Sequence, residues 1–448
     1  PGRGRSQPTK EFLMKDSGIE WIGEIPKGWE VRKLKYLTLC NANSLSETTS
    51  KDTIIKYIDI SSISEEKGIF TEQVYNFASA PSRARRVVHT NDTIISTVRT
   101  YLKAVAYIDS RHNNYICSTG FAVLSALSDI SSKFIYYIVY SDNFIKNTEK
   151  LSTGISYPAI TANQLHNIKV PFPPLAEQQR IADYLDTKCA HIDQCLELTR
   201  QSMEKLRAYK LSCITEAVTK GLDPDVPLKD SGVPWIGNIP KRWTLTKILR
   251  ALDMPITDGP HETPEFFESG IPFISAESIK NEEIDFSLKR GFISEDFYNY
   301  CCNKYKPKLN DIYMIKSGAT TGKIAIVSTT EKFQIWSPLA VFRVNSKNNY
   351  RFIFYSLQST SFQRQIENNW SYGTQQNIGM RTLEKIPLPL PPLPEQERIA
   401  AYLDKKCARI DALLEEKQAL LDKLAEYKKS LIFECVTGKR EVPSCWNR

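Results

Sequence analysis

The stretch from Gly318 to Lys323 (GATTGK) is the nearest that this chain comes to a catalytic motif. A phosphate-binding loop has four residues between its glycines and a Ser or Thr after its lysine, whereas here three residues separate the glycines and Ile324 follows the lysine. The two Pro-Pro pairs lack the flanking residues of an amino-methyltransferase motif, and Pro224-Asp225 has no acidic-x-Lys partner downstream that would indicate a nuclease. We therefore expect a chain that binds rather than catalyses, with no cofactor of its own.

The ten cysteines and five histidines do not form a strong metal-binding pattern. No Cys-x-x-Cys pair occurs, and we interpret most cysteines as buried, reduced thiols. His191 and Cys195 are four residues apart and could share a metal ion, but the second copy of this stretch, described next, has Arg409 and Leu413 in their places. We expect no metal site.

Two long unbroken stretches must position whatever this chain binds. They run from Pro171 to Thr219 and from Pro389 to Thr437, 218 positions apart, and after a Pro-rich entry neither contains Gly or Pro until Gly221 or Gly438. This punctuation predicts two long helices. About 40 helical residues would extend roughly 60 Å, which is more than one domain core needs, although two ordinary core helices are the alternative.

Apolar residues recur along both stretches at alternating spacings of four and three, which is the a/d pattern of a coiled coil. The pattern persists almost position by position in the second copy, so we expect the two helices to pack antiparallel through this seam. Its members are Leu185, Cys189, Ile192, Leu196, Thr199, Met203, Leu206, Lys210, Cys213 and Ala217 in the first copy, and Leu403, Cys407, Ile410, Leu414, Lys417, Leu421, Leu424, Lys428, Leu431 and Cys435 in the second.

The repeat extends beyond the helices. KDSGIEWIGEIPKGW (residues 15–29) returns as KDSGVPWIGNIPKRW (residues 229–243), so each unit comprises a Trp-bearing entry, a globular segment, a Pro-rich hinge and a helix. The globular segments share only traces, such as Asn91-Asp92 and Asn310-Asp311 before apolar runs, and otherwise diverge. Helical spacing appears only briefly, over residues 133–146 and 350–366. We expect a flexible leader or expression remnant over 1–14, globular domains over 15–170 and 222–386, hinges with helices over 171–221 and 387–440, and a tail over 441–448.

Composition bounds the class of protein. The chain is 41% hydrophobic, enough to bury two or three domain cores, and contains no run of 18 apolar residues. Its net charge of +8 fits a polyanionic partner without requiring one. We expect a cytoplasmic protein with no membrane partner.

The stretches at residues 389–417 and 15–29 closely resemble the repeated regions of the specificity subunits of type I restriction-modification enzymes. TDGPHETP (257–264), followed by GIPFI (270–274), also looks like the opening of a common target-recognition domain in that family. The resemblance covers the whole chain in layout. It implies an α+β protein with an internal pseudo-two-fold repeat, in which two mixed α/β target-recognition domains are separated by two antiparallel helices.

The same resemblance implies a non-catalytic subunit in host defence that reads double-stranded DNA. The seam helices would dock two methyltransferase subunits, and restriction/translocase subunits would join through them; S-adenosylmethionine, ATP and Mg²⁺ would bind those partners. Because the globular segments differ, the bipartite target should be asymmetric, with half-sites about one DNA turn, roughly 34 Å, apart. The first segment departs from the family pattern, since it lacks both the His-x-Thr-Pro opening and the Gly-x-x-x-Gly-Lys loop and has residues 96–103 (STVRTYLK) instead.

Polar loop residues are the candidates for DNA contacts, because basic side chains hold phosphates while Arg, Asn, Gln and Thr read base edges. Any single one of them can equally be an exposed charge. An alternative function for the whole chain is a non-catalytic coiled-coil adaptor whose domains bind protein. The DNA-binding candidates are Arg83, Arg85, Arg86, Arg99, Lys103, Ser152, Gly154, Ser156 and Tyr157 in the first domain, and His261, Thr263, Lys316, Thr320, Thr321, Lys323, Tyr372, Gln375, Gln376 and Asn377 in the second.

Overall fold

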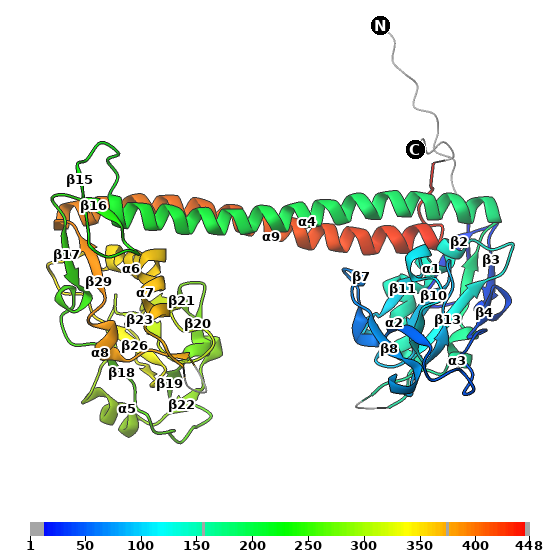
Figure 1. Cartoon of the computed structure of the whole chain (residues 1–448), viewed down its shortest axis with the longest axis horizontal. Coiled ribbons are helices and arrows are strands. Elements are labelled where there is room, and N and C mark those ends of the chain that lie inside the picture. The colour runs from blue at the N-terminus through cyan, green and yellow to red at the C-terminus, as the bar shows by residue number, and fades with distance from the viewer. Residues whose placement is uncertain (1–12, 155–156, 373–375, 444–448) are drawn as a thin grey trace, which may run out of the picture. The chain divides into compact units, whose positions relative to one another are not determined.

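A computed structural model describes residues 13–154, 157–372 and 376–443 (Figure 1). Most of the expected leader and tail, and the candidate residues Ser156 and Gln375, lie outside the described residues. The chain forms two compact units, Pro1–Thr199 with Ala419–Arg448 and Arg200–Gln418. Each unit contains one globular domain, one half of the first long helix and one half of the second.

The two predicted long helices are confirmed as α4 (Leu175–Lys220) and α9 (Leu393–Val436). Each begins one residue after a Pro-Pro pair, where a missing backbone N–H costs least, and each is followed closely by a glycine with positive φ, Gly221 or Gly438. No helix in the described part of the chain combines the length and the apolar character needed to cross a bilayer.

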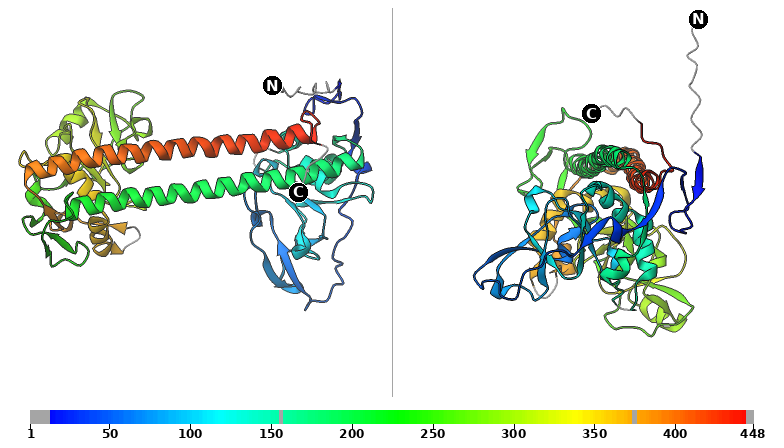
Figure 2. Two further views of the ribbon diagram at one scale, coloured as in Figure 1. Left: turned by 90° about the horizontal axis from the view of Figure 1, so that it is seen from above. Right: turned by 90° about the vertical axis from the view of Figure 1, so that its right-hand side faces the viewer.

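The composition of the units makes the helices antiparallel, as expected. The first unit joins the beginning of α4 to the end of α9, and the second joins the end of α4 to the beginning of α9 (Figure 2). Asp193 pairs with Lys428 at 2.6 Å in the first unit, and Lys210 pairs with Asp411 at 2.9 Å in the second. These pairs are equivalent, because a shift of 218 converts Asp193 to Asp411 and Lys210 to Lys428.

Most of the seam is buried, and each half of it joins the core of its own unit. Leu185 and Leu403 are fully buried, whereas Leu206 and Leu424 are half-buried. Two of the three lysines at seam positions, Lys210 and Lys428, are accommodated by the two ion pairs just described. The other buried members are Cys189, Ile192, Leu196, Met203, Ala217, Cys407, Ile410, Leu431 and Cys435, and the other half-buried members are Thr199, Cys213, Leu414, Lys417 and Leu421.

The first globular domain is built on two four-stranded sheets. One is antiparallel, in the order β11-β10-β13-β4, and the other is mixed, in the order β8-β5-β12-β9, with β5 and β12 parallel. Their bounds are β4 (Thr38–Cys40), β5 (Ile54–Ile58), β8 (Gln73–Asn76), β9 (Ala84–Val87), β10 (Thr93–Ser96), β11 (Val105–Tyr107), β12 (Ile116–Ser118) and β13 (Phe121–Ala126). A hairpin of two short strands, β6 (Ile63–Ser64) and β7 (Gly68–Ile69), lies beside them.

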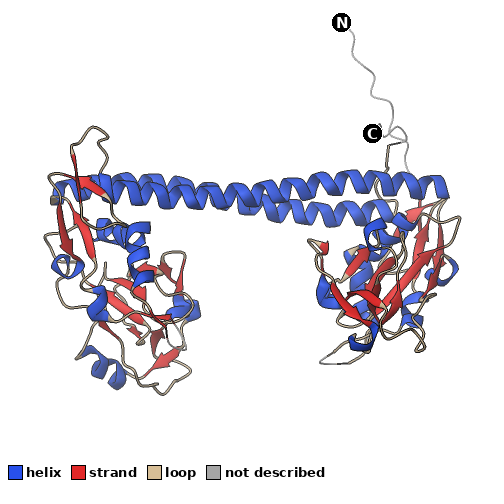
Figure 3. Ribbon diagram, in the orientation of Figure 1, coloured by secondary structure: helices blue, strands red, loops and turns tan. Residues whose placement is uncertain are grey.

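The second domain repeats this topology with other side chains, except that its mixed sheet has three strands and lacks a counterpart of β9 among the described residues. Both domains are built of short strands and helices (Figure 3). Its sheets run β24-β23-β26-β18 and β22-β19-β25, with β19 and β25 parallel, and the hairpin is β20-β21. Their bounds are β18 (Thr257–Asp258), β19 (Ile271–Ile274), β20 (Ile279–Lys280), β21 (Glu283–Ile284), β22 (Gly291–Ile293), β23 (Ile312–Ile315), β24 (Ile324–Ile326), β25 (Gln334–Ile335) and β26 (Leu339–Phe342), and helix α5 (Glu295–Cys302) follows β22.

The predicted Asn-Asp turns are equivalent in the structure. Asn91 and Asn310 adopt positive φ of 76° and 69°. The following carboxylates are buried: Asp92 accepts from the N–H of His89 at 2.7 Å, and Asp311 accepts from the N–H of Lys308 at 2.9 Å. A local carboxylate therefore fixes the turn that launches the central strand of each antiparallel sheet.

The single helices expected over residues 133–146 and 350–366 are each two helices. They are α1 (Ser132–Tyr140) with α2 (Asp142–Leu151), and α6 (Tyr350–Gln358) with α7 (Thr360–Asn368). Ser141 and Ser359 interrupt them with extended backbone. Serine competes with helix through local hydrogen bonds, which the apolar spacing did not reveal.

Equivalent contacts fix each domain to the long helix that follows it. The Gln178 side chain, fully buried, accepts from the N–H of Ser131 before α1, and Gln396 accepts from the N–H of Asn349 before α6. Each domain also closes as a two-stranded stem, β3 (Glu30–Lys33) with β14 (Lys169–Phe172) and β17 (Thr244–Lys247) with β29 (Pro387–Leu390). The beginning of each Pro-rich hinge is thus a strand.

Short paired strands and a short helix complete each unit. In the first, β1 (Met14–Asp16) pairs with β2 (Glu24–Pro26), and α3 (Ala162–His166) precedes the stem. In the second, β15 (Leu228–Asp230) pairs with β16 (Asn238–Pro240), β27 (Ser371–Tyr372) pairs with β28 (Gln376–Asn377), and α8 (Met380–Leu383) precedes the stem.

Candidate nucleic-acid interface

In the first domain, the β10–β11 loop (residues 97–104) lies against the described part of the segment after α2 (residues 152–154 and 157–160). The N–H of Arg99 donates to the carbonyl of Pro158 at 2.7 Å, and the N–H of Ile160 donates to the carbonyl of Thr97 at 2.9 Å. Within the loop, the N–H of Leu102 donates to the carbonyl of Arg99. Two segments about 50 residues apart in sequence, both containing DNA-binding candidates, therefore form one surface.

The second domain builds the same surface from the β23–β24 loop (residues 316–323) and the segment after α7. The N–H of Gly318 donates to the carbonyl of Gln376, and the N–H of Ile378 donates to the carbonyl of Lys316, at 2.9 and 3.0 Å. The N–H of Thr321 donates to the carbonyl of Gly318. Each bond has its counterpart in the first domain at an offset of 218 or 219 residues.

The first loop lacks the two glycines of the second loop but still has a positive φ at both equivalent positions. Gly318 and Gly322 have φ of 108° and 94°, and their counterparts Arg99 and Lys103 have φ of 50°. A non-glycine residue in this left-handed region costs roughly 1–2 kcal/mol. The first domain therefore forms the corresponding loop with strained residues at the two turning points, which the sequence comparison did not reveal.

The first-domain candidates separate into exposed and internal side chains. Arg99 stacks on the exposed ring of Tyr157 at 4.4 Å, and Gly154 is exposed beside them. Lys103, by contrast, is buried, with its ammonium paired to Glu65 at 2.8 Å and to Asp142. Lys103 therefore anchors the loop from within.

The remaining first-domain candidates lie at the loop's margin. Ser152 Oγ is half-buried and donates to the carbonyl of Thr148 at 2.7 Å. Arg83 is exposed at the start of the neighbouring sheet, and Arg85 stacks on Phe77 at 4.8 Å. Arg86 is half-buried, and its Nε and Nη1 atoms are enclosed without a hydrogen-bond partner among the described residues.

Arg86 faces the domain interior. Burial raises the pKa of the Cys117 thiol to about 12, and the Arg86 guanidinium partly opposes this rise. The charge of Arg86 therefore lies close to a fully buried thiol, away from the loop surface. A β-strand position alone did not distinguish this inward arginine from its exposed neighbour Arg83.

The second-domain candidates form one cluster. Thr320, Lys323 and Asn377 are exposed, and Gln376 is half-buried next to the loop. The Thr321 hydroxyl donates to the carbonyl of Gly318 at 2.7 Å. The side chain of Tyr372 is not among the described ones.

Asp258, which sequence reasoning missed, connects the TDGPHETP stretch to this cluster. Its carboxylate is 1% exposed and lies 3.3 Å from Lys316 Nζ, 3.1 Å from His261 Nε2 and 2.5 Å from Lys304 Nζ. A cavity of about 540 Å³ opens beside it, lined by Asp258, His261, Tyr300 and Lys304 among others. Lys316 and His261 therefore both contact the buried carboxylate of Asp258. Thr263, two residues after His261, is exposed.

The tight approach of Gly259 explains the glycine in that stretch. A Cβ atom on Gly259 would lie 1.9 Å from the carbonyl oxygen of Ile335. Only glycine allows the chain directly after β18 to run this close to β25, and this approach holds Asp258 beside Lys316, Lys304 and His261.

Removal of the Asp258 carboxylate should destabilise the second domain. We expect Asp258→Ala to lower the free energy of unfolding by about 3 kcal/mol, mainly because Lys316, whose side chain is 12% exposed, is left uncompensated. Lys304→Ala is the matched control, since Lys304 is half exposed and its loss should cost about 1 kcal/mol or less. Urea unfolding of the full chain measures both, and equal effects would contradict the assignment.

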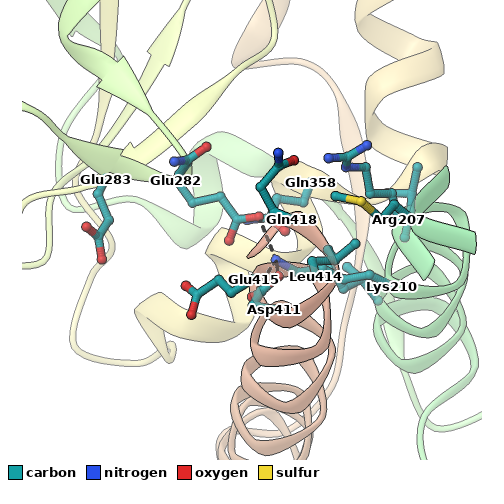
Figure 4. Close-up of a pocket in the computed structure, with 13 residues that line it drawn as sticks. Arg207, Lys210, Glu282, Glu283, Gln358, Asp411, Leu414, Glu415 and Gln418 are labelled. Atoms are coloured by element: carbon teal, nitrogen blue, oxygen red, sulfur yellow. Dashed lines mark hydrogen bonds and ion pairs between the residues drawn. The ribbon is translucent and has the colours of Figure 1, made fainter. Parts of the chain in front are cut away.

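A second polar site lies between the hairpin β20-β21 and the long helices within the second unit (Figure 4). It encloses about 780 Å³ and is lined by Lys210, Glu282, Asp411 and Gln358 among others. Burial alone lowers the pKa of Lys210, but the carboxylates of Glu282 and Asp411, each within 3.0 Å, raise it above its usual value. Lys210 stays protonated and connects the second globular domain to the helices.

Potential metal ligands do not gather among the described residues. Within residues 13–154, 157–372 and 376–443, no three His, Cys, Asp or Glu side chains are placed to hold a metal ion. His191 and Cys195 are both exposed on α4.

Comparison with known proteins identifies the family. Residues 26–208 and 258–423 each match the model of the type I restriction modification DNA specificity domain. The chain belongs to this family. The two matched stretches coincide with the two repeats, so the specificity domain occurs twice in this chain.

Relatives agree with this assignment. The chain is 29% identical over 280 residues to the type I restriction enzyme MjaVIII specificity subunit of Methanocaldococcus jannaschii, covering 60% of this chain and 62% of that protein. A chain solved in a study of complex assembly and conformational transition of the type I restriction-modification system has a TM-score of 0.74 and 25% identity, covering 93% of this chain and 99% of that one. The HsdS subunit from Thermoanaerobacter tengcongensis shares the fold, with a TM-score of 0.54 and 24% identity over 93% of this chain and 98% of that one.

Proposed function

We propose that this specificity-family chain is the DNA-recognition subunit of a type I restriction-modification complex. Each domain contacts one half of a bipartite DNA target through the loop surface described above. The target is asymmetric, because the two surfaces share a backbone but present different side chains. The observation that carries this proposal is the pair of equivalent loops at β10–β11 and β23–β24.

The partners follow from the same proposal. Two methyltransferase subunits dock on the chain, restriction/translocase subunits join through them, and the complex acts on DNA in the cytoplasm. This chain contributes no catalytic group, while S-adenosylmethionine, ATP and Mg²⁺ bind to the partner subunits. The protein-adaptor alternative is disfavoured by the double match to a DNA specificity domain.

Methylome sequencing of cells that express this chain with its methyltransferase subunit tests the proposal. We expect one modified motif with two different half-sites separated by a fixed gap. Binding of the purified complex to that motif should weaken by orders of magnitude between 50 and 200 mM salt, because phosphate contacts release counterions. A complex that leaves DNA unmodified and binds it independently of salt would overturn the proposal and favour the adaptor.

A further inference from the structure

The tip of the β10–β11 loop presents two large apolar side chains to solvent. Tyr101 and Leu102 are 52% and 50% exposed, although the residues on either side, Thr100 and Lys103, are 2% and 7% exposed. The two side chains are adjacent and form a small apolar patch, and apolar patches rimmed by polar residues are typical of contact sites.

The loop is held rigidly in the shape that exposes this pair. Lys103 is anchored by Glu65 from the β6-β7 hairpin and by Asp142 at the start of α2. Asp142 in turn lies 3.7 Å from Lys429 of α9 within the same unit. Backbone strain at Arg99 and Lys103 persists because these contacts fix the conformation, and strain of this kind concentrates at functional sites.

The second domain shows that an apolar tip is not needed to form the loop. The counterparts of Thr100, Tyr101 and Leu102 are Ala319, Thr320 and Thr321, and the two loops share their turning points and their hydrogen bonds. Tyr101 and Leu102 are therefore not required by the fold of the loop.

The surroundings of the tip fit nucleic acid. Arg99, at the root of the loop, stacks on the exposed ring of Tyr157, 64% exposed. Arg83 is exposed on the neighbouring sheet; its carbonyl accepts from the N–H of Thr119, and Gly120 binds Thr97 of the loop. Guanidinium groups can bind DNA phosphates, and an aromatic ring can stack on a base. This combination beside the apolar tip fits nucleic acid better than an apolar groove of a protein.

We propose that Tyr101 and Leu102 form an apolar wedge that enters the first half-site and unstacks one base step. This inference rests on the proposed function. Apolar side chains inserted between base pairs kink DNA and generate preference for easily unstacked steps, whereas the tip of the second domain presents the exposed hydroxyl of Thr320. The two half-sites are thus recognised by different physical means on the same backbone.

The test uses the complex of this chain with its methyltransferase subunits and duplexes that carry the mapped target. 2-Aminopurine placed at successive positions of each half-site reports unstacking. We expect the wild-type complex to increase fluorescence at one step of the first half-site. The double variant Tyr101→Ala/Leu102→Ala should abolish the increase and weaken binding about 10- to 100-fold, since base–aromatic contacts carry effects of this size.

The matched control is Thr320→Ala/Thr321→Ala, which alters the equivalent tip and should leave the fluorescence of the first half-site unchanged. Tyr101→Phe/Leu102→Met retains the apolar surface and should keep both signals, which separates the wedge from a folding defect. Wild-type affinity and fluorescence in the double variant would overturn the wedge. Intact DNA binding with loss of methyltransferase assembly would instead assign the tip to a protein contact. A wild-type complex that binds no target DNA would refute the proposed function itself.

Discussion

Replacing residues 34–168 with a second copy of residues 248–386 is expected to give a complex whose modified motif contains one half-site sequence twice. Both halves should match the sequence that the second domain reads in the parent, and the former first half-site should disappear. Each graft carries its own loop surface, so the side chains that meet the bases change as a set.

The stems make this exchange possible. The cut points lie just inside the ribbons β3-β14 and β17-β29, and the N–H of Leu34 donates to the carbonyl of Ile168 at 3.0 Å as that of Ile248 donates to Ile386 at 2.9 Å. A graft therefore enters a stem of matching geometry.

The docking contacts survive the exchange as well. Tyr137 donates to Asp186 at 2.6 Å in the first unit, and Tyr355 donates to Asp404 at 2.7 Å in the second. These pairs are equivalent at an offset of 218, so the grafted Tyr355 should meet Asp186.

Methylome sequencing reads the outcome of the exchange. The reciprocal graft, residues 34–168 in place of 248–386, is the control and should duplicate the other half-site. If either grafted chain folds, assembles with the methyltransferase and still modifies the parental motif, the globular domains do not determine the DNA sequence that is recognised.

Long-range periodicity made the helices predictable. The helix boundaries are marked by local residues, namely the Pro-rich entries and the glycines that follow the helices. The seam from Leu185 to Cys435 is marked by its repetition in the second copy. Both signals are present in a single sequence. The common topology of the domains was not predictable, because their short strands differ in nearly every side chain and are related only through pairings such as β5 with β12 and β19 with β25.

The candidate site was predictable as a region but not residue by residue. Residues 97–104 and 316–323 form equivalent loops, yet Lys103 is buried because Glu65 and Asp142, 38 and 39 residues away, enclose its ammonium. Asp258 was missed because a lone carboxylate in the sequence gives no sign of the Lys316, Lys304 and His261 side chains that surround it. The exposure of Tyr101 and Leu102 depends on a left-handed backbone at Arg99 and Lys103, which residue type does not predict.

A matched insertion in both long helices is expected to widen the gap between half-sites by one or two base pairs. Four residues added after Arg200 in α4 and four after Leu420 in α9 lengthen both helices at the same level, because the pairs Asp193 with Lys428 and Lys210 with Asp411 set opposing positions whose numbers sum to 621. Four helical residues add about 6 Å and about 40° beyond a full turn. DNA advances about 3.4 Å and about 34° per base pair. The added helix length therefore matches a gap that is two base pairs longer, and the added rotation matches a gap that is one base pair longer.

The insertion also distinguishes the helices from other determinants of spacing. A four-residue insertion is a stutter that a coiled coil absorbs by local unwinding, so assembly should persist. Affinity for the parental spacing should fall steeply, since tethered half-sites at the wrong distance lose an effective-concentration advantage of about 10²- to 10⁴-fold.

The same four residues placed between Asp223 and Pro224, both exposed and outside the helices, should leave the gap unchanged. A variant that assembles normally and keeps the parental gap despite longer helices would mean that DNA contacts, rather than α4 and α9, fix the separation of the half-sites.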